Sequence, residues 1–327
     1  MATGNQLKAL LRSLEEGDDE RLYSIGLQMA AHEARLGHGK LALEMRELLD
    51  AIRARHRIAP ERQPIPLVQP KGELAGILSV AYPEVRLADM VLAEETEARL
   101  LRVILEQRQQ ARLNDHGLHP RAKLLLTGPP GSGKTLTAKA LAAELRLPLF
   151  SIMLDGLITK FMGETAAKLR LVFDAMKRTR GVYLFDEFDA IGGQRNVSND
   201  VGEVRRILNS FLSMLEEADR SALIVAATNH PELLDPALFR RFDDVLQYTL
   251  PGSDLILRTI RSRFSSLDVD AVDWRHVTLN AEGLSYAEII KACEDAAKEA
   301  VLSGSHGVTT PMLLRSIGER KGMPRRT

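Results

Sequence analysis

The segment that most constrains how this chain can fold is Gly128-Pro129-Pro130-Gly131-Ser132-Gly133-Lys134-Thr135. It follows Lys123-Leu124-Leu125-Leu126-Thr127, which predicts a short buried strand, and it precedes residues 136–145, whose apolar residues recur at helical spacing. A strand, a glycine-rich loop, Lys-Thr and a helix in this order predict a phosphate-binding loop. The glycines allow successive backbone N–H groups to point at one phosphate group, and the N-terminus of the helix adds positive charge.

Two side chains complete the predicted loop. Lys134 can reach the outer phosphates of a bound nucleotide, and the hydroxyl of Thr135 can coordinate Mg2+. The remaining phosphate contacts are expected from the loop itself and from the next residue of the helix: Gly128, Pro129, Pro130, Gly131, Ser132, Gly133 and Leu136. A glycine-rich turn that binds nothing is the alternative. It is disfavoured because the strand and the helix both lie where such a loop needs them.

Composition narrows the class of protein. The chain has 327 residues with 44 basic and 44 acidic side chains, so no global field favours nucleic acid or an anionic membrane. Cys293 is the single cysteine, which excludes an internal disulfide, fits a reducing cytosol and suggests a small core residue. The sequence has no apolar run long enough to span a membrane and no signal peptide. We therefore expect a cytoplasmic protein without a membrane partner.

The chain is expected to contain four parts. Residues 1–58 show helical periodicity and predict an N-terminal helical bundle, which would either dock a client or partner or stabilise an oligomer. Residues 59–84 are punctuated by prolines and predict an extended linker. Residues 85–250 predict a large α/β domain, and residues 251–327 a small helical domain.

Alternating strands and helices define the α/β part. Besides the strand before the loop, strand-length apolar runs occur at residues 149–153, 181–185, 222–227 and 245–248. Helical patterns cover residues 92–110, 165–176 and 201–215, and further helices are expected at 254–266, 285–302 and 310–318. Near-continuous apolar strands separated by helices predict a parallel sheet covered on both faces. In the first of these helices, Leu100, Leu101, Ile104 and Leu105 are expected to be buried.

Two acids end the strand at residues 181–185. Because ligands of open α/β sheets collect at the carboxyl ends of the strands, Asp186 and Glu187 are expected near the phosphate-binding loop. Asp186 can face a metal ion through water, while Glu187 orients and polarises an attacking water. The alternative is a solvated strand end without function.

Three further polar residues lie next to predicted strands. Asn229 ends the next strand and can hold the water or the γ-phosphate. Arg240 and Arg241 precede the last strand. Such a pair is usually a surface feature, and the functional interpretation is an arginine finger supplied to a neighbouring subunit in a head-to-tail ring.

Together these motifs resemble the AAA family of P-loop ATPases, within the larger AAA+ group, over about residues 85–303. Gly128–Thr135 resembles Walker A, residues 184–187 resemble Walker B, and Asn229 matches sensor 1. The adjacent Arg240 and Arg241 match the paired arginines of the second region of homology, and their adjacency is similar to that in katanin and spastin relatives. The resemblance implies ATP and Mg2+ as cofactors, a helical lid and a homohexameric ring. It also implies five parallel strands in the order fifth, first, fourth, third, second.

A further stretch resembles the family's pore loop. Residues 159–164 place an aromatic residue, an apolar residue and a glycine in succession, and the loop itself is formed by Lys160, Phe161, Met162 and Gly163. In a ring, Phe161 and Met162 would project into the channel and grip a polypeptide; the alternative is that Phe161 is a core residue. Residues 194–202 are a weaker candidate for a second pore loop.

Two positions depart from the family pattern. In Gly283-Leu284-Ser285-Tyr286-Ala287-Glu288, Tyr286 stands where the family's lid motif has a glycine close to the nucleotide. In Asp89-Met90-Val91-Leu92, the family's glycine is missing near the adenine. Neither change touches the phosphate chemistry.

The resemblance implies an ATP-hydrolysing, ring-forming remodeller or unfoldase that acts on a polypeptide. The sequence has no H-E-x-x-H zinc-protease motif, so any proteolysis would come from a separate protease or through an adaptor. Two other classes stay open: an AAA+ machine that acts on complexes bound to nucleic acid, and a scaffold that binds ATP only to assemble.

Overall fold

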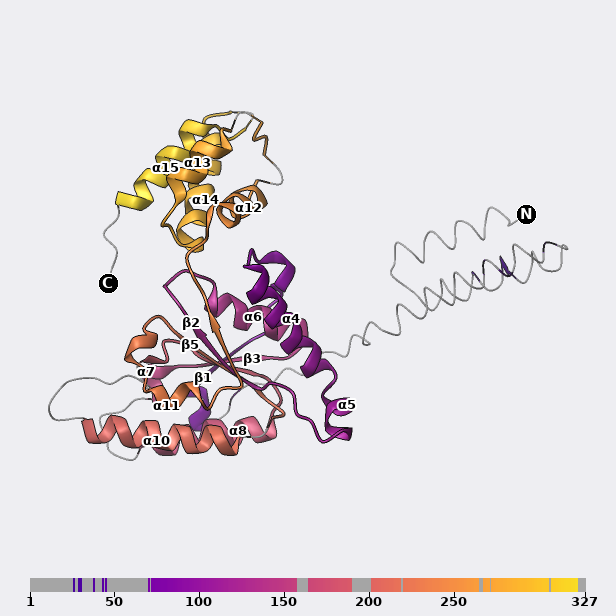
Figure 1. Cartoon of the computed structure of the whole chain (residues 1–327), viewed down its shortest axis with the longest axis vertical. Helices are drawn as coiled ribbons and strands as arrows, with labels where there is room; N and C mark the ends of the chain where they lie inside the picture. The colour runs from indigo at the N-terminus through magenta and orange to yellow at the C-terminus, as the bar shows by residue number, and fades with distance from the viewer. Residues whose placement is uncertain are drawn as a thin grey trace. The chain divides into compact units, whose positions relative to one another are not determined.

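The structure is a computed structural model. It describes residues 72–157, 164–189, 201–218, 220–264, 267–270, 272–305 and 307–322, together with Pro70 and isolated positions before residue 46. The chain divides into two compact units, Met1–Pro66 and Leu67–Thr327. The helical bundle expected over residues 1–58 lies outside the described residues apart from those isolated positions, so the fold below is that of the second unit (Figure 1).

The centre of this unit is a six-stranded sheet in the order β1-β3-β4-β5-β2-β6. Its parallel strands are β2 (Lys123–Thr127), β3 (Leu149–Ile152), β4 (Val182–Phe185), β5 (Leu223–Thr228) and β6 (Asp244–Gln247). Counted along the chain, these five strands have the order that the family resemblance implies.

The sixth strand was not expected. Strand β1 (Leu78–Ala81) pairs antiparallel with β3, from Leu78 opposite Ile152 to Ala81 opposite Leu149. It follows the 3-10 helix η1 (Gly72–Gly76). The five predicted parallel strands are present, and β1 is an antiparallel addition to them. Residues 78–81, which were expected to belong to an extended linker, form this strand. The prolines around this short segment hid its strand pattern, which is only four residues long.

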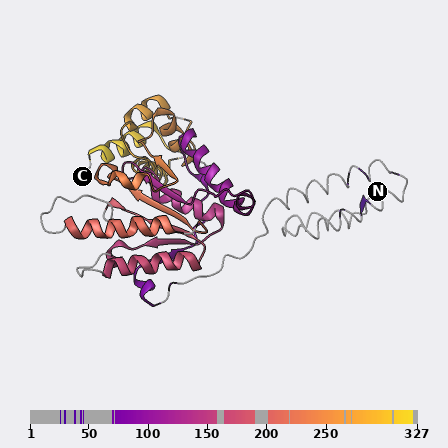
Figure 2. The same ribbon diagram turned by 60° about the horizontal axis from the view of Figure 1, so that its bottom comes forward.

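Helices cover both faces of the sheet (Figure 2). Helices α4 (Glu94–Arg108) and α6 (Lys134–Leu145) pack on one face, and α8 (Glu164–Arg178) and α10 (Val201–Glu217) on the other. The sheet has one hydrophobic core on each face, and each strand contributes to both cores because successive side chains point to opposite faces. In β4, Val182 and Leu184 join the first core, while Tyr183 and Phe185 join the second.

Helix α4 buries only part of the apolar set that its periodicity predicts. Leu100 and Ile104 are buried as expected, but Leu101 and Leu105 are 52% and 55% exposed. One residue further along a helix is about 100° further around its axis, so Leu101 and Leu105 lie beside the buried stripe rather than in it. The expectation that all four leucine and isoleucine side chains are buried was wrong for these two.

The C-terminal helices have a core of their own, which contains Ile256, Ile260, Val277, Ile289, Leu313 and Ile317. They are α12 (Ser253–Ser262), α13 (Trp274–Ala281), α14 (Tyr286–Leu302) and α15 (Thr310–Gly322). Helix α13 is an addition to the three predicted helices. Cys293 lies in this core, 1% exposed, and burial raises the pKa of its thiol to about 12, so its prediction as a core residue is confirmed.

Shorter elements connect these layers. They are η2 (Leu87–Asp89), α5 (Gln110–Asp115), α7 (Leu154–Leu157), η3 (Pro231–Leu233) and α11 (Pro236–Phe239). Among the residues that the structure describes, no helix combines the length and apolarity needed to cross a membrane.

Candidate active site

The glycine-rich loop joins the carboxyl end of β2 to the N-terminus of α6, as predicted. Gly128 has a φ of 140°, and a Cβ added there would come 2.3 Å from the carbonyl oxygen of Tyr248. Gly131 has a φ of 73°, and an added Cβ would come 2.7 Å from the Oγ atom of Ser285. Both positions therefore disfavour any residue but glycine, for backbone angle and for space.

Lys134 is the first residue of α6 and is buried. Its Nζ atom donates hydrogen bonds of 2.7 Å and 2.8 Å to the carbonyl oxygens of Gly128 and Pro129. Burial lowers the pKa of its ammonium to about 8, although the charges of Asp186 and Asp189 act in the opposite direction. The cation thus lies within the loop, close to two carboxylates, where a phosphate group would find it.

Thr135 and Asp186 meet across the site. The Oγ1 atom of Thr135 donates a hydrogen bond of 2.7 Å to Oδ2 of Asp186, and Oδ1 of Asp186 accepts the backbone N–H of Glu187 at 3.0 Å. This hydroxyl and carboxylate suit Mg2+, which prefers oxygen ligands and takes one or two from protein while phosphates and water supply the rest. The described residues contain no cluster of three or more His, Cys, Asp or Glu that could hold a metal without such help.

Glu187 follows directly and is exposed. Its φ of 51° lies in the left-handed region, which is uncommon for a residue other than glycine. Backbone strain of this kind clusters at functional sites, because the surrounding structure must hold it in place. Here the neighbours do so, since Asp186 is bonded to Thr135 and the N–H of Phe188 donates to the carbonyl oxygen of Ala227 at 2.8 Å.

Asn229 follows β5, the strand beside β4, and is partly buried. Next to it is a contact that sequence reasoning missed: Oγ1 of Thr228 donates a hydrogen bond of 2.8 Å to Oδ1 of Asp189. The signal for Asp189 was present, as a third acid in the run that begins at Asp186, but no pairing with Thr228 could be inferred from spacing.

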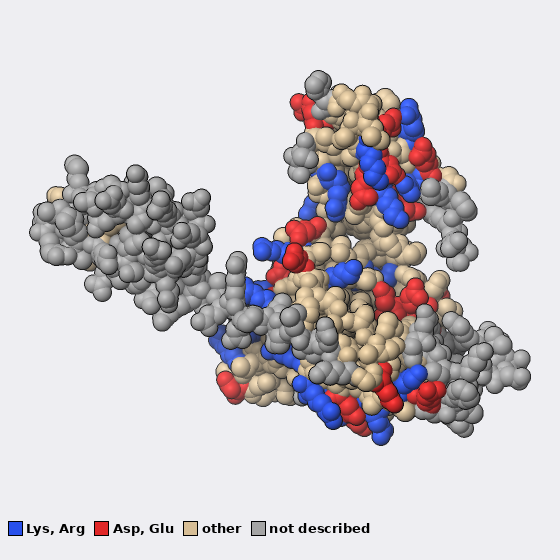
Figure 3. All heavy atoms as spheres, turned by 180° about the vertical axis from the view of Figure 1, so that it is seen from behind, with Lys and Arg blue, Asp and Glu red and all other residues tan. Residues whose placement is uncertain are grey.

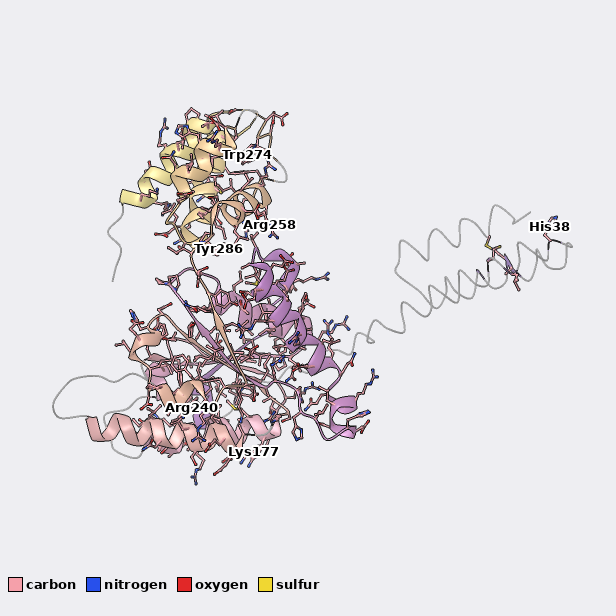
Figure 4. All side chains as sticks on the ribbon, in the orientation of Figure 1. His38, Lys177, Arg240, Arg258, Trp274 and Tyr286 are labelled. Carbon is pink, nitrogen blue, oxygen red and sulfur yellow. The ribbon has the colours of Figure 1, made fainter. Side chains whose placement is uncertain are left out.

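The two arginines do not approach the loop of their own chain. Both precede β6, whose first residue, Asp244, lies opposite Leu124 in β2. The phosphate-binding loop starts four residues beyond Leu124, which corresponds to roughly 13 Å along the strand. Arg240 is exposed and lies on the α8–α10 side of the sheet (Figure 4). Arg241 forms an ion pair with Glu216 of α10.

The C-terminal helices contact the loop through the start of α14. Ser285 caps this helix by accepting the N–H of Glu288, whose side chain in turn accepts the N–H of Ser285. In the first turn of α14, the N–H of Ala287 donates a hydrogen bond to the carbonyl oxygen of Gly131. A cavity of about 590 Å³ adjoins this contact, and Leu92, Thr127, Tyr248 and Tyr286 are among the residues that line it.

Tyr286 is thus accommodated at the position where the family pattern has a glycine. Its phenol is half-buried, and burial raises its pKa while the charge of Arg258 lowers it. Both residues belong to the C-terminal helices and are labelled in Figure 4. The predicted pore-loop residues Lys160, Phe161, Met162 and Gly163 lie outside the described residues, as do residues 194–200 of the second candidate loop.

Comparison with known proteins decides the family. The model of the protein family described as "ATPase family associated with various cellular activities (AAA)" matches residues 124–250. An "Uncharacterized AAA family ATPase y4kL" of Sinorhizobium fredii is 36% identical over 302 residues, which are 92% of this chain and 90% of that protein. The chain belongs to the AAA family of ATPases. The family inferred from the motifs is confirmed.

Other AAA relatives are matched over part of their length. A "Proteasome-activating nucleotidase" of Methanococcus vannielii is 36% identical over 216 residues, 63% of this chain and 53% of that protein. An "ATP-dependent zinc metalloprotease FtsH" of Lancefieldella parvula is 38% identical over 202 residues, 59% of this chain and 31% of that protein. The chain therefore spans about half of the first relative's length and less of the second's.

Proposed function

We propose that this AAA ATPase assembles into a ring of identical subunits, a hexamer, and couples ATP hydrolysis to the remodelling or unfolding of a polypeptide. In this proposal the polypeptide is drawn through a central pore and can be passed to a separate protease or received from an adaptor. The observation that carries the ATPase part is the contact between Thr135 and Asp186, with Glu187 beside it.

The proposed roles follow from this geometry. Lys134 and the loop amides bind the phosphates, and Thr135 and Asp186 hold Mg2+, which neutralises phosphate charge. Glu187 orients and polarises the attacking water, and Asn229 senses the γ-phosphate. Because phosphoryl transfer depends on positioning and electrostatic stabilisation, few further groups are needed.

Arg240 and Arg241 are proposed to complete the site of a neighbouring subunit. They lie at the amino end of β6, whereas the chain's own phosphate-binding loop lies at the carboxyl end of β2. A group on one side of a subunit that serves a neighbour's site on the other side requires head-to-tail contacts, which form a ring when the rotation between subunits closes. Arg241 would have to leave Glu216, while Arg240 is already exposed.

Two observations support a polypeptide as the substrate. Relatives over the AAA region carry names that link them to protein degradation, the proteasome-activating nucleotidase and FtsH. Basic and acidic side chains are interspersed on the described surface seen in Figure 3, which offers no continuous basic track for nucleic acid. Phe161 and Met162 are the residues proposed to grip the polypeptide, and residues 1–58 to dock clients.

Phosphate release by the full chain tests this proposal, with an unfolded protein or DNA added. Stimulation by the unfolded protein is expected, and Glu187→Gln should retain ATP binding and ring assembly while losing turnover. Stimulation by DNA alone would favour action on nucleic-acid complexes. Binding without any turnover would favour an ATP-dependent scaffold. Glu217→Gln, on the exposed end of α10, is the matched control and should keep wild-type turnover.

A further inference from the structure

The hydroxyl of Thr228 links the carboxyl ends of two neighbouring strands, β4 and β5. It donates a hydrogen bond of 2.8 Å to Oδ1 of Asp189 and accepts the backbone N–H of His230 at 3.0 Å. Thr228 is 1% exposed, and both bonds are partly buried. Because the hydroxyl binds the backbone two residues further on, it holds the chain on both sides of Asn229.

The end of β4 is held at points on either side of Glu187. On one side, Asp186 accepts the hydroxyl of Thr135. On the other, Phe188 is buried, donates its N–H to the carbonyl oxygen of Ala227, and packs its ring 4.9 Å from that of Phe211. The left-handed backbone of Glu187 is therefore fixed by its neighbours.

Asp189 connects these two ends. The ladder between β4 and β5 has its last register pair at Phe185 and Ala226, and the bond from Thr228 to Asp189 ties the chain segments beyond that pair. A shift of the Asp189 side chain would therefore alter the positions of both Glu187 and Asn229.

We propose that Asp189 is a positioning residue for ATP hydrolysis, which acts through Thr228 to hold Asn229 and Glu187 in register across the site. Asp189 itself does not need to touch the nucleotide. This inference rests on the proposed roles of Glu187 and Asn229. It implies that the turnover rate depends on Asp189, whereas the affinity for ATP, set by the loop and Lys134, does not.

Kinetics of the full chain test the inference. Asp189→Ala and Thr228→Val should each lower kcat by about 10- to 100-fold, the range found when supporting groups of a site are removed. The Kd for a non-hydrolysable ATP analogue should stay close to that of the wild type. Asp189→Asn keeps an oxygen that accepts from Thr228, and Thr228→Ser keeps the hydroxyl, so both should retain most of kcat.

The double variant sharpens the test. If Asp189 acts through Thr228, Asp189→Ala combined with Thr228→Val should lose no more than either single variant. Additive losses, unchanged kcat in Asp189→Ala, or a loss confined to ATP affinity would each overturn the inference. If Asp189→Ala does not fold, the comparison of Thr228→Ser with Thr228→Val decides, since equal kcat values there would overturn it as well.

Two controls separate this inference from the proposed function. Asp174→Ala removes an acid of α8 that pairs with Lys177 outside the site, and it should leave kcat unchanged. Wild-type turnover that Glu187→Gln abolishes supports the proposed function whatever Asp189 does. In that case, normal kcat in Asp189→Ala refutes the positioning role alone.

Discussion

The backbone N–H of Ala287 donates a hydrogen bond of 3.1 Å to the carbonyl oxygen of Gly131. Ala287 lies in the first turn of α14, and Gly131 lies in the phosphate-binding loop. The Oγ atom of Ser285, which caps α14, occupies the space beside Gly131. The C-terminal helices and the phosphate-binding loop are therefore in direct contact, and a change in the loop backbone reaches α14.

Gly131→Ala tests this contact. The new methyl group would clash with Ser285 and would stand on a backbone with φ of 73°, a conformation that costs about 1–2 kcal/mol for residues with a side chain. Since ATP must restore the loop geometry, we expect its Kd to rise by roughly 5- to 30-fold, as measured by titration with a fluorescent analogue. Gly252→Ala, where an added Cβ meets nothing within 4 Å, is the matched control and should bind normally.

Mixing experiments test whether Arg240 acts on another subunit. Arg240→Ala should be inactive, because a missing arginine finger costs about 10³- to 10⁵-fold in kcat. Lys134→Ala should also be inactive, because it removes the cation that binds the phosphates. Mixed rings contain some interfaces with an intact Lys134 on one subunit and an intact Arg240 on the next, so the mixture should regain phosphate release. A mixture that stays as inactive as its components contradicts the role in trans. Arg178→Ala, an exposed arginine at the end of α8, is expected to be fully active alone.

Neighbouring leucines of α4 should differ sharply in their effect on stability. Leu100→Ala creates a cavity in the core and should lower the free energy of unfolding by about 2–5 kcal/mol. Leu101→Ala removes a side chain that is 52% exposed and should cost less than about 1 kcal/mol. Denaturant unfolding of the two variants measures both values, and equal losses would place Leu101 in a buried interface.

The pair of Asp295 and Arg320 should make the C-terminal helices sensitive to acid. The hydrogen bond from Arg320 lowers the pKa of the Asp295 carboxyl below its ordinary 3.8. Its contribution is therefore complete above about pH 5 and is lost as the pH falls through the lowered pKa. Because the pair is partly exposed, Asp295→Asn should cost about 1 kcal/mol or less at pH 7.

Thermal unfolding at two pH values checks this sign. The difference between Asp295→Asn and the wild type should be present at pH 7 and should shrink toward zero in strong acid. A difference that grows in acid would contradict the assignment. Glu294→Gln, which changes the exposed neighbour on the same helix, is the control and should unfold at the wild-type temperature at pH 7.

The extent to which the sequence predicted the structure differs from one residue to the next. The loop from Gly128 to Thr135 was predictable because its chemistry depends on neighbours in sequence. The order of the five parallel strands came from the family resemblance. Strand β1 was missed because its pairing with β3 joins residues 68 or more positions apart, and a four-residue run between prolines carries little periodicity.

The finer site contacts depend on tertiary structure. The ion pair of Arg241 with Glu216 and the bond from Thr228 to Asp189 join residues from different elements, and no spacing rule predicts them. Tyr286 departs from the family's glycine, and only the structure shows the space that accepts it, beside a cavity of about 590 Å³. Local patterns thus predicted which residues gather at the strand ends, while packing decided which of them touch.

Strand β1 has a mechanical consequence. Without it, β3 would be an edge strand, yet β3 leads through α7 into the segment of Phe161 and Met162. With it, β3 is hydrogen-bonded on both sides, and the N–H of Met153 extends the ladder by donating to the carbonyl oxygen of Ile77 at 2.8 Å. Separating β3 from the sheet therefore requires breaking two ladders rather than one.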